Sequence, residues 1–327
     1  MQQPVFSPEQ ICSAEDFNSV CLATFQFQYE ENPVYRSYCD LLHVSPVDVQ
    51  CINAIPYLPI QFFKSHKVRS VHNEPELFFS SSSTSGQGTS KHFIQDLSLY
   101  QKSFRLGFKL HYGKVKDWAI LALLPSYLER EGSSLIYMME DLIQASEHPA
   151  SGFYLDNYKA LNEQLVELEK AEQPTLLLGV SFALLDFAEQ FPMALKHTVV
   201  METGGMKGRR KELIREELHR QLQNGFKVSS VHSEYGMTEL LSQAYSKGNG
   251  LFYCPPWMKV SASDINDPLS PAPEGKIGRL SIIDLANQES CAFIATDDLG
   301  KVYPDGSFEV LGRLDASDIR GCNLMVY

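Results

Sequence analysis

The stretch "DWAILALLP", residues 117–125, and the stretch "SSLIYMMEDLIQASEH", residues 133–148, together decide the fold class. The first is a continuous apolar run, which is typical of a strand buried on both faces of a sheet. The second places its apolar residues at the spacing of an amphipathic helix. Residues 117–148 are therefore interpreted as one strand followed by one helix.

The same alternation continues along the chain and predicts an α/β fold. Strands that alternate with helices form mostly parallel sheets flanked by helices on both faces. Ligands in such folds bind beyond the carboxyl ends of the strands. The last of the expected helices has a glycine stop at its end. The expected helices are 154–173, 181–191 and 207–225, and the expected strands are 174–180, 196–205 and 226–236.

The segments on either side of this region have a different texture. The first fifty residues have helical spacing, and "AIPYLPIQFFKSH", residues 54–66, predicts an extended connection because proline punctuates it. After about residue 250 the chain becomes short β-like segments, and the Asp-Gly pair of "YPDGS", residues 303–307, indicates a hairpin. We therefore divide the chain into an α/β portion with the N-terminal helical segment, residues 1–250, and a small β-rich subdomain, residues 251–327.

Composition and charge exclude several classes of partner. The chain has 327 residues, 44% hydrophobic content and a formal net charge of −12, which disfavours general binding to nucleic acid or to an anionic membrane surface. The N-terminus lacks the pattern of a signal peptide, and no apolar run reaches the roughly 18 residues of a membrane span. We expect a cytoplasmic protein that neither spans a membrane nor binds nucleic acid. The seven cysteines contain no CxxC pair, which argues against a disulfide framework and a zinc site.

Four short stretches carry residues suited to nucleotide chemistry. The first, "FFSSSSTSGQGTSKH" at residues 78–92, is either a flexible linker or a loop whose backbone N–H groups, hydroxyls and Lys91 surround phosphate. Composition alone leaves both interpretations open. The other three are "HSEYGMTEL" at 232–240, "TDDLG" at 296–300 and "GRLDASDIRGC" at 312–322.

The last three stretches offer groups that match the parts of a nucleotide. Tyr235 can stack on a base, and Gly236 permits a close approach of the backbone to a ligand. Thr238 can donate to a phosphate, and Glu239 is a hard oxygen ligand for Mg²⁺. An aspartate of "TDDLG" can accept both hydroxyls of a ribose, and Arg313 can bind phosphate or ribose. Each stretch taken alone is also compatible with an ordinary turn.

In this order the four stretches resemble the motif series of the adenylate-forming superfamily, which includes acyl-CoA synthetases, peptide-synthetase adenylation domains and luciferases. The resemblance extends over most of residues 78–321. It implies a protein that uses ATP and Mg²⁺ to activate a carboxylic acid as an acyl adenylate. One departure is Asp297, which stands where the family usually has Gly, beside the aspartate matched to the ribose-binding position.

Carried over by position, the resemblance implies a nucleotide site and a set of catalytic residues. Thr238 would contact the α-phosphate and Glu239 would hold the magnesium ion, and both would act in catalysis with Lys91. The phosphates would be bound by Ser83, Thr84, Ser85, Gly86 and Lys91. The adenine would lie against Gly204, Gly205, Tyr235 and Gly236, and the ribose or phosphate against Asp298 and Arg313.

One branch of the superfamily resembles the chain more closely, namely the acyl-protein synthetases of the bacterial luminescence fatty acid reductase system. The shared stretches are "IPYLPIQFFK" at residues 55–64, the serine-rich loop, and the ending "GRLDASDIRGCNLMVY" at 312–327. As in that branch, we expect the mobile C-terminal domain of the superfamily, with its essential lysine, to be absent. In that branch a cysteine near the C-terminus takes the acyl group as a thioester and passes it to a reductase, and the matching residue here is Cys322.

Three functional hypotheses follow from this resemblance. The favoured one is an ATP-dependent acyl-protein synthetase that activates a fatty or aromatic acid, acylates Cys322 and hands the acyl group to a partner such as an acyl reductase or transferase. The alternatives are an acyl- or aryl-CoA ligase and a non-catalytic nucleotide-binding subunit of an acyl-transfer complex. For His92, next to Lys91, we favour a solvent-facing position over an approach to the phosphates, and His232 either lines the acyl pocket or has a packing role.

Overall fold

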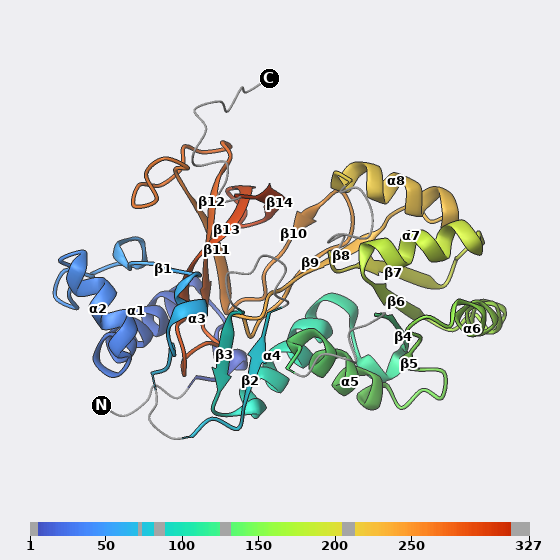
Figure 1. The fold of residues 1–327 in the computed structure, drawn as a ribbon, viewed down its shortest axis with the longest axis horizontal. Coiled ribbons are helices and arrows are strands. Elements are labelled where there is room, and N and C mark those ends of the chain that lie inside the picture. The colour runs from blue at the N-terminus through green and yellow to red at the C-terminus, as the bar shows by residue number, and fades with distance from the viewer. Residues whose placement is uncertain (1–5, 71–73, 82–88, 125–131, 205–212, 315–327) are drawn as a thin grey trace.

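Two β-sheets organise the chain, one among the helices of its middle region and one built largely from its C-terminal strands (Figure 1). A two-stranded hairpin, β2–β3, lies between them near the lower edge of this view. The computed structural model describes residues 6–70, 74–81, 89–124, 132–204 and 213–314.

The first sheet confirms the predicted α/β architecture. Its strands run in the order β5-β4-β6-β7-β8-β9, with parallel neighbours from β5 to β8 and an antiparallel β9 at the edge. Every residue of β4 and β6 is buried, which is why these strands read as unbroken apolar runs. The strands are β4 Ala119–Leu123, β5 Gly152–Phe153, β6 Thr175–Gly179, β7 Thr198–Glu202, β8 His232–Tyr235 and β9 Ala244–Ser246.

Helices cover both faces of this sheet. In Figure 1, α7 and α8 lie on one side of the strands, and α4 and α5 lie on the other. Side-chain caps begin three of the helices of this region, at Asp96, Ser133 and Asn157. The helices are α4 Leu97–Tyr112, α5 Ser134–Ser146, α6 Tyr158–Lys170, α7 Ser181–Gln190 and α8 Arg215–Phe226.

The second sheet confirms that the C-terminal part is rich in β-structure. Its strands run β10-β14-β13-β12-β11 with antiparallel neighbours, and β1 joins β13 in parallel. The predicted Asp-Gly hairpin connects β13 to β14, and Gly306 in its turn has a φ of +83°. The strands are β1 Leu58–Pro59, β10 Leu251–Phe252, β11 Met258–Ser263, β12 Gly278–Asp284, β13 Phe293–Val302 and β14 Phe308–Arg313.

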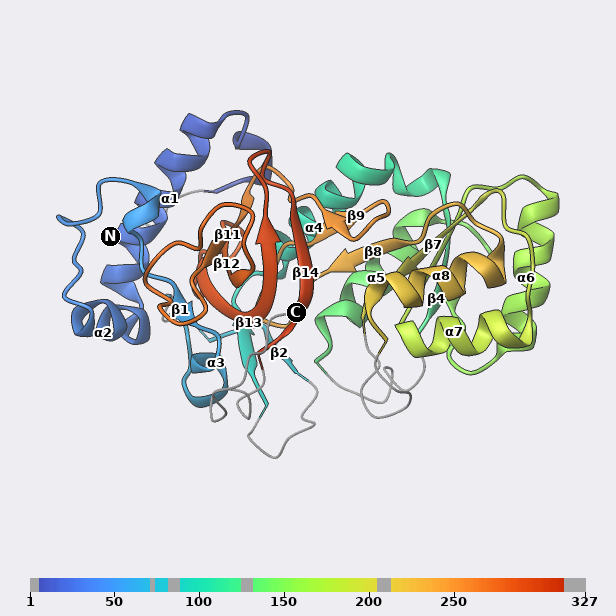
Figure 2. The ribbon, with the colours of Figure 1, turned by 90° about the horizontal axis from the view of Figure 1, so that it is seen from above.

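The N-terminal helices lie beside this second sheet, although they are far from it in sequence (Figure 2). Tyr35 stacks on Phe293 of β13, with ring centroids 6.0 Å apart. The Gln28 side chain forms three hydrogen bonds with backbone groups of the loop 287–292. The division of the chain at residue 250 stays a prediction. The helices, which confirm the helical character of this region, are α1 Ala14–Glu31 and α2 Pro33–Leu41.

Two regions differ from the sequence-based expectation. Residues 54–66 are not wholly extended, because one helical turn, α3 Phe62–Ser65, follows β1. Helix α4 has no counterpart among the predicted elements, although Tyr100, Phe104 and Phe108 repeat every fourth residue on its buried face. The remaining elements are β2 Leu77–Ser80, β3 Lys91–Ile94 and the 3₁₀ turns Pro8–Gln10, Ile52–Ala54 and Val115–Asp117.

Gly225 has a different role from the predicted helix stop. Helix α8 continues to Phe226, and Lys227 takes the left-handed conformation after it, with a φ of 54°. A Cβ atom at position 225 would lie 2.8 Å from the Cβ atom of Ala188 in α7. The glycine therefore allows α7 and α8 to approach each other closely.

We predict that Gly225→Ala lowers the free energy of unfolding by about 1 kcal/mol, because overpacking of about 1–3 kcal/mol outweighs the gain of about 1 kcal/mol in helix propensity. Ala188→Gly in the same chain removes the clash. The double variant is therefore expected to lose less free energy of unfolding than the sum of the losses of the two single variants. Urea unfolding of all four proteins measures this coupling. A Gly225→Ala protein more stable than the parent would contradict the interpretation.

Candidate active site

The predicted nucleotide residues that the structure describes gather where the two sheets meet. Gly204 follows β7 and Tyr235 ends β8, so both lie at the carboxyl edge of the parallel sheet. Asp298 of β13 and Arg313 of β14 are direct partners in the second sheet. In Figure 2 the end of β8 points toward β14. Both sheets therefore contribute to the site.

Tyr235, Asp298 and Arg313 form one hydrogen-bonded group, which we call the junction cluster. The Tyr235 hydroxyl donates to Asp298 Oδ2 at 2.7 Å, and Arg313 Nε donates to Asp298 Oδ1 at 3.2 Å. Tyr235 and Asp298 are each only 8% exposed. Burial and the charge of Asp298 raise the pKa of the Tyr235 hydroxyl, which therefore stays protonated and can donate.

Glu239 supplies a buried carboxylate near this cluster. It is 5% exposed, and burial raises its pKa, while a hydrogen bond from Ser90 and the positive charges of Arg313 and Lys64 oppose that rise. In the part of the chain that the structure describes, no group of three or more His, Cys, Asp or Glu side chains could hold a metal ion. A single carboxylate fits Mg²⁺ that arrives with phosphates, because Mg²⁺ keeps waters and substrate oxygens as ligands.

His92 is buried, so the expectation that it faces solvent is wrong. Its Nδ1 lies 2.9 Å from the carbonyl oxygen of Thr238, and its Nε2 lies 2.9 Å from Ser290 Oγ. A carbonyl oxygen only accepts, so the neutral ring carries its proton on Nδ1 and accepts the Ser290 hydroxyl at Nε2. Burial lowers the pKa of His92 to about 4, although the bond to Thr238 opposes this shift. The ring thus ties the motif residue Thr238 to strand β3.

Lys91 is the exposed first residue of β3, beside His92. Its Nζ lies 5.3 Å from the ring centroid of Phe78, and in the hairpin it pairs with Ser80. The hairpin therefore brings together the two chain ends that flank the serine-rich loop. Gly236 is exposed and Thr238 is half-buried. The predicted residues Ser83, Thr84, Ser85, Gly86, Gly205 and Cys322 lie outside the described residues.

Asp284 holds the chain that leaves the "YGMTE" motif. This fully buried residue ends β12 and accepts hydrogen bonds from the N–H groups of Leu241 and Ser242 at 2.8 and 3.0 Å. It also accepts the Ser242 hydroxyl at 2.5 Å, and that hydroxyl oxygen in turn accepts the indole N–H of Trp257 at 3.0 Å. The motif is therefore fixed to the second sheet on its C-terminal side.

Glu202 supports the turn that contains Gly204. Its Oε2 accepts the N–H of Gly204 at 2.8 Å, and the φ of +65° at this glycine is one that other residues adopt at a cost. Burial alone would raise the pKa of Glu202. Hydrogen bonds with His219, Ser233 and the Gly204 N–H and the charge of Arg215 outweigh this effect and lower the pKa to about 2. Arg215 also donates to the carbonyl oxygen of Val310 at 2.6 Å, which links this turn to β14.

Sequence reasoning missed polar residues that surround the site. Gln61 Nε2 donates to Asp297 Oδ1 at 2.6 Å, and Arg279 Nη2 donates to the same oxygen at 2.6 Å. Asp297 thus forms an ion pair with Arg279, and its charge also acts on Arg313 of the junction cluster. Gln61 and Lys64 both belong to "IPYLPIQFFK", a stretch that carries the resemblance but to which the sequence assigns no role.

His232 lies against helix α4. Its Nδ1 is 3.2 Å from the Tyr112 hydroxyl, and the two rings are 5.8 Å apart between centroids. Burial, with the nearby positive charge of Lys247, lowers the pKa of His232 to about 4. These contacts support the packing and hydrogen-bonding interpretation, and the proposed place of His232 in an acyl pocket stays a prediction.

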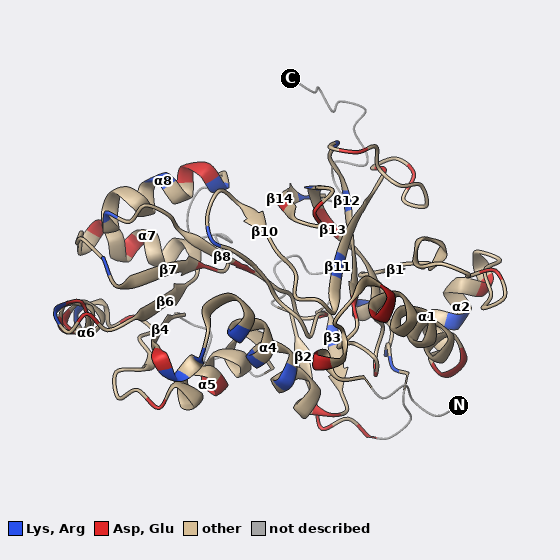
Figure 3. Cartoon of the chain, turned by 180° about the vertical axis from the view of Figure 1, so that it is seen from behind, with Lys and Arg blue, Asp and Glu red and all other residues tan. Residues whose placement is uncertain are grey.

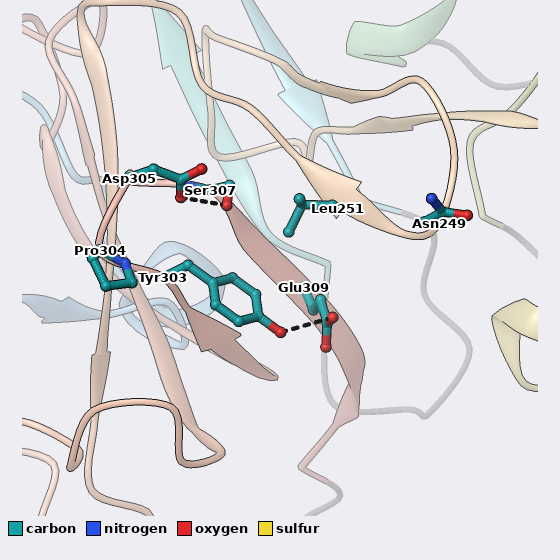
Figure 4. Close-up of a pocket in the computed structure, with 7 residues that line it drawn as sticks. All are labelled: Asn249, Leu251, Tyr303, Pro304, Asp305, Ser307 and Glu309. Atoms are coloured by element: carbon teal, nitrogen blue, oxygen red, sulfur yellow. Dashed lines mark hydrogen bonds between the residues drawn. The ribbon is translucent and has the colours of Figure 1, made fainter.

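Figure 3 shows the basic positions spread over several elements and interspersed with acidic ones. No helix in the described ranges combines the length and apolarity needed to cross a membrane. A hollow at the β13–β14 turn contains no predicted site residue, and its Asp305 and Glu309 already bind neighbouring hydroxyls (Figure 4). It is lined by Asn249, Leu251, Tyr303, Pro304, Asp305, Ser307 and Glu309.

We predict that His92 makes the folded state sensitive to acid. Because the folded pKa of about 4 lies below the ordinary value of 6.5, the stabilising contribution is complete above pH 6.5 and is lost as the pH falls toward 4. Between pH 7 and pH 5 the wild type should lose about 2 kcal/mol more unfolding free energy than His92→Asn. Urea unfolding at both pH values measures the difference, with exposed His43→Asn as the control. Equal losses in wild type and His92→Asn would refute the prediction.

One protein-family model matches most of the chain. The family model described as Acyl-protein synthetase, LuxE, matches residues 6–112 and 134–327. The chain is 27% identical over 327 residues to the long-chain-fatty-acid–luciferin-component ligase of Aliivibrio fischeri, and the match covers 92% of this chain and 85% of that protein. The ligase of the same name from Vibrio harveyi is 23% identical over 325 residues, covering 92% and 84%.

Solved structures with a similar fold are adenylate-forming enzymes. An open conformation of 2-hydroxyisobutyryl-CoA ligase, in complex with 2-HIB-AMP and CoA, has a TM-score of 0.65 at 13% identity and covers 97% of this chain and 75% of its own. ATP-bound MatB from Rhodopseudomonas palustris has a TM-score of 0.54 at 16% identity. The match covers 74% of this chain and 49% of MatB, so this chain spans about half of MatB. At these identities the likeness is one of fold. The chain belongs to the acyl-protein synthetase family LuxE, a family of ligases, and it has the fold of adenylate-forming enzymes.

Proposed function

We propose that this protein is an ATP-dependent acyl-protein synthetase. It activates a carboxylic acid as acyl-AMP, transfers the acyl group to the thiol of Cys322, and passes it to a partner protein. The observation that carries the proposal is the meeting of Gly204, Tyr235, Asp298 and Arg313 at the junction of the two sheets. These residues come from separate motifs, and one shared nucleotide accounts for their meeting.

The junction cluster is suited to a ribose. A carboxylate offers about four acceptor sites, and Tyr235 and Arg313 each take one site of Asp298. The remaining sites can accept the two ribose hydroxyls. The turn at Gly204 and Gly205 and the motif Tyr235–Gly236 then flank the adenine, while Ser83, Thr84, Ser85, Gly86 and Lys91 surround the phosphates.

In the first step, a carboxylate oxygen of the acid attacks the α-phosphorus of ATP and the bond to pyrophosphate breaks. Lys91 and Arg313 offset the negative charge that develops, and Thr238 donates to the α-phosphate. Glu239 is the residue that would hold Mg²⁺, which when bound supplies further charge neutralisation at the phosphates. His92 positions the Thr238 backbone through its Nδ1.

In the second step, a thiolate attacks the acyl carbon and the bond to AMP breaks. Buried thiols are poor candidates for this role, since burial raises the pKa of both Cys21 and Cys39 to about 12. Burial also raises the pKa of Cys254 and Cys291. Cys322 follows Arg320 and Gly321 in the sequence, and a nearby positive charge favours the thiolate.

The proposed acceptor rests on the chemistry of the thioester, and the proposed acid rests on the names of the relatives. A thioester on the enzyme keeps the carbonyl activated after AMP leaves, so the acyl group can pass to a second protein. The two curated relatives are named as ligases of long-chain fatty acids and a luciferin component. We therefore propose a fatty acid as the substrate class, and an acyl reductase or transferase as the partner.

We predict that ATP, Mg²⁺ and a suitable fatty acid add one acyl mass to the wild type and none to Cys322→Ser. Intact-protein mass spectrometry measures the addition, and hydroxylamine should remove it because it cleaves thioesters. Cys12→Ser and Cys51→Ser, which change exposed thiols, are the matched controls and should be acylated like the wild type.

Pyrophosphate recorded in the same samples separates the alternatives. Cys322→Ser should still release pyrophosphate, since the first step does not need the thiol. Pyrophosphate without any acyl mass in the wild type would refute the thioester step, and CoA-dependent AMP formation would then favour an acyl-CoA ligase. Nucleotide binding without pyrophosphate release would favour a non-catalytic subunit.

We predict that Glu239→Gln slows pyrophosphate release by roughly 10²-fold, the scale for losing one electrostatic contact in a transition state. The amide keeps the shape of the side chain but removes the charge that would hold Mg²⁺, so the Mg²⁺ concentration needed for half-maximal rate should also rise. Pyrophosphate assays over a Mg²⁺ series measure both effects, with exposed Glu140→Gln as the control. An unchanged Mg²⁺ requirement would argue against the role proposed for Glu239.

A further inference from the structure

A buried polar group lies on the motif strand, and the proposed nucleotide site does not use it. Tyr235 pairs with Ala244, and Glu234 pairs with Tyr245, in the antiparallel pair β8–β9. By continuation of this register, Gly236 stands opposite Gln243. Side chains alternate between faces along a strand, so Glu234, Gly236 and Gln243 share one face of the sheet, and Tyr235 faces the other.

The glycine on this face allows a carboxylate and an amide side chain to approach the backbone closely. A Cβ atom at Gly236 would lie 2.5 Å from Glu234 Oε1 and 3.5 Å from Gln243 Cγ. Thr203, which follows the neighbouring strand β7, donates its hydroxyl to Glu234 Oε2 at 2.5 Å. Three polar side chains therefore converge beside the exposed backbone of Gly236.

Gln243 is the member of this group that indicates a ligand. Its side chain is buried, with 6% exposure, and its Oε1 has no hydrogen-bond partner among the described residues. An unpaired buried oxygen is costly, and a donor that reached it would remove that cost. Glu234 is 9% exposed, and burial and the charge of Glu202 raise its pKa to about 7, although Thr203 opposes the shift.

We propose that Thr203, Glu234 and Gln243 form a specificity site that selects acids bearing a hydrogen-bond donor, a hydroxyl or an amino group, near the carboxylate. The inference rests on the proposed function, in which Thr238 contacts the α-phosphate, so the carboxylate that attacks this phosphate would lie near the same motif. A donor on the acid would bind Gln243 Oε1 and the carboxyl of Glu234. A plain alkyl chain would leave Gln243 Oε1 without a partner.

Equilibrium binding tests the proposal without requiring catalysis. Isothermal titration with a non-hydrolysable ATP analogue present compares a plain acid with acids of equal length that carry a hydroxyl or an amino group next to the carboxylate or one carbon further along. We expect the best donor-bearing acid to bind the wild type about tenfold more tightly or better, the factor that one net hydrogen bond supplies.

Gln243→Leu removes the unpaired oxygen while keeping a side chain of similar size. We expect it to abolish the preference, to leave binding of the plain acid equal or tighter, and to raise the melting temperature, since a buried unpaired oxygen is lost. The raised melting temperature separates a lost ligand contact from a damaged fold. Exposed Gln26→Leu is the matched control and should keep the wild-type preference.

Glu234→Gln distinguishes the two donors. An amino group is positively charged and needs the negative charge of the carboxylate. This variant should therefore weaken binding of the acid that carries an amino group more than binding of the acid that carries a hydroxyl. Equal binding of plain and donor-bearing acids by the wild type, or an unchanged preference in Gln243→Leu, would overturn the proposal. If the protein releases pyrophosphate but binds plain and donor-bearing acids equally, this inference alone is overturned. If it prefers donor-bearing acids but releases no pyrophosphate, the proposed function alone is overturned.

Discussion

The carboxylate of Asp284 is the constraint on which the candidate site depends. It is buried at the end of β12, and it accepts two backbone N–H groups and one hydroxyl from the pair Leu241–Ser242. A buried carboxylate with several donors is stable only when all of them stay in place. The chain just after the motif is therefore attached to the second sheet, while the chain just before it, in β8, belongs to the first.

This double attachment explains why motif residues from distant parts of the sequence meet. The first sheet supplies Tyr235 and the turn at Gly204, the second supplies Asp298 and Arg313, and the hairpin β2–β3 supplies His92 and Lys91. The contacts between these parts include buried hydrogen bonds, which depend strongly on geometry, and ring contacts of Tyr235 with Phe252 and Phe308. A small displacement of one sheet against the other would separate Tyr235 from Asp298 before it disturbed either core.

The sequence predicts some features well because a single physical signal determines them. The apolar runs of β4 and β6 identify buried parallel strands, and the Asp-Gly turn identifies the β13–β14 hairpin. Other features depend on neighbours that are remote in sequence. The burial of His92 follows from its contacts with Thr238 and Ser290, and Gly225 is explained by Ala188 on another helix. The aromatic repeat of α4 was readable, but its face is mixed with polar residues.

The residues of the candidate site also fall into those with a local sequence signal and those that depend on remote neighbours. The motifs indicate Tyr235, Glu239, Asp298 and Arg313 as candidates, since those residue types suit the parts of a nucleotide. Glu234 and Gln243 carry no such signal, because a polar residue beside a motif is ordinary until its burial and its missing partner are known. Asp297 and Asp298 are adjacent in sequence, yet one binds Arg279 and Gln61 and the other binds Tyr235 and Arg313.

The pairing of β1 with β13 has a consequence for synthesis on the ribosome. The N-terminal helices and β1 leave the ribosome well before their partners in the second sheet, β13 and the loop 287–292. The first sheet, from β4 to β9, is continuous in the chain and can form earlier. The aromatic residues of the N-terminal helices, including Phe25 and Tyr35, are therefore covered only after β13 has been synthesised. Such long-range closure is slow, and it makes the nascent chain dependent on protection from aggregation.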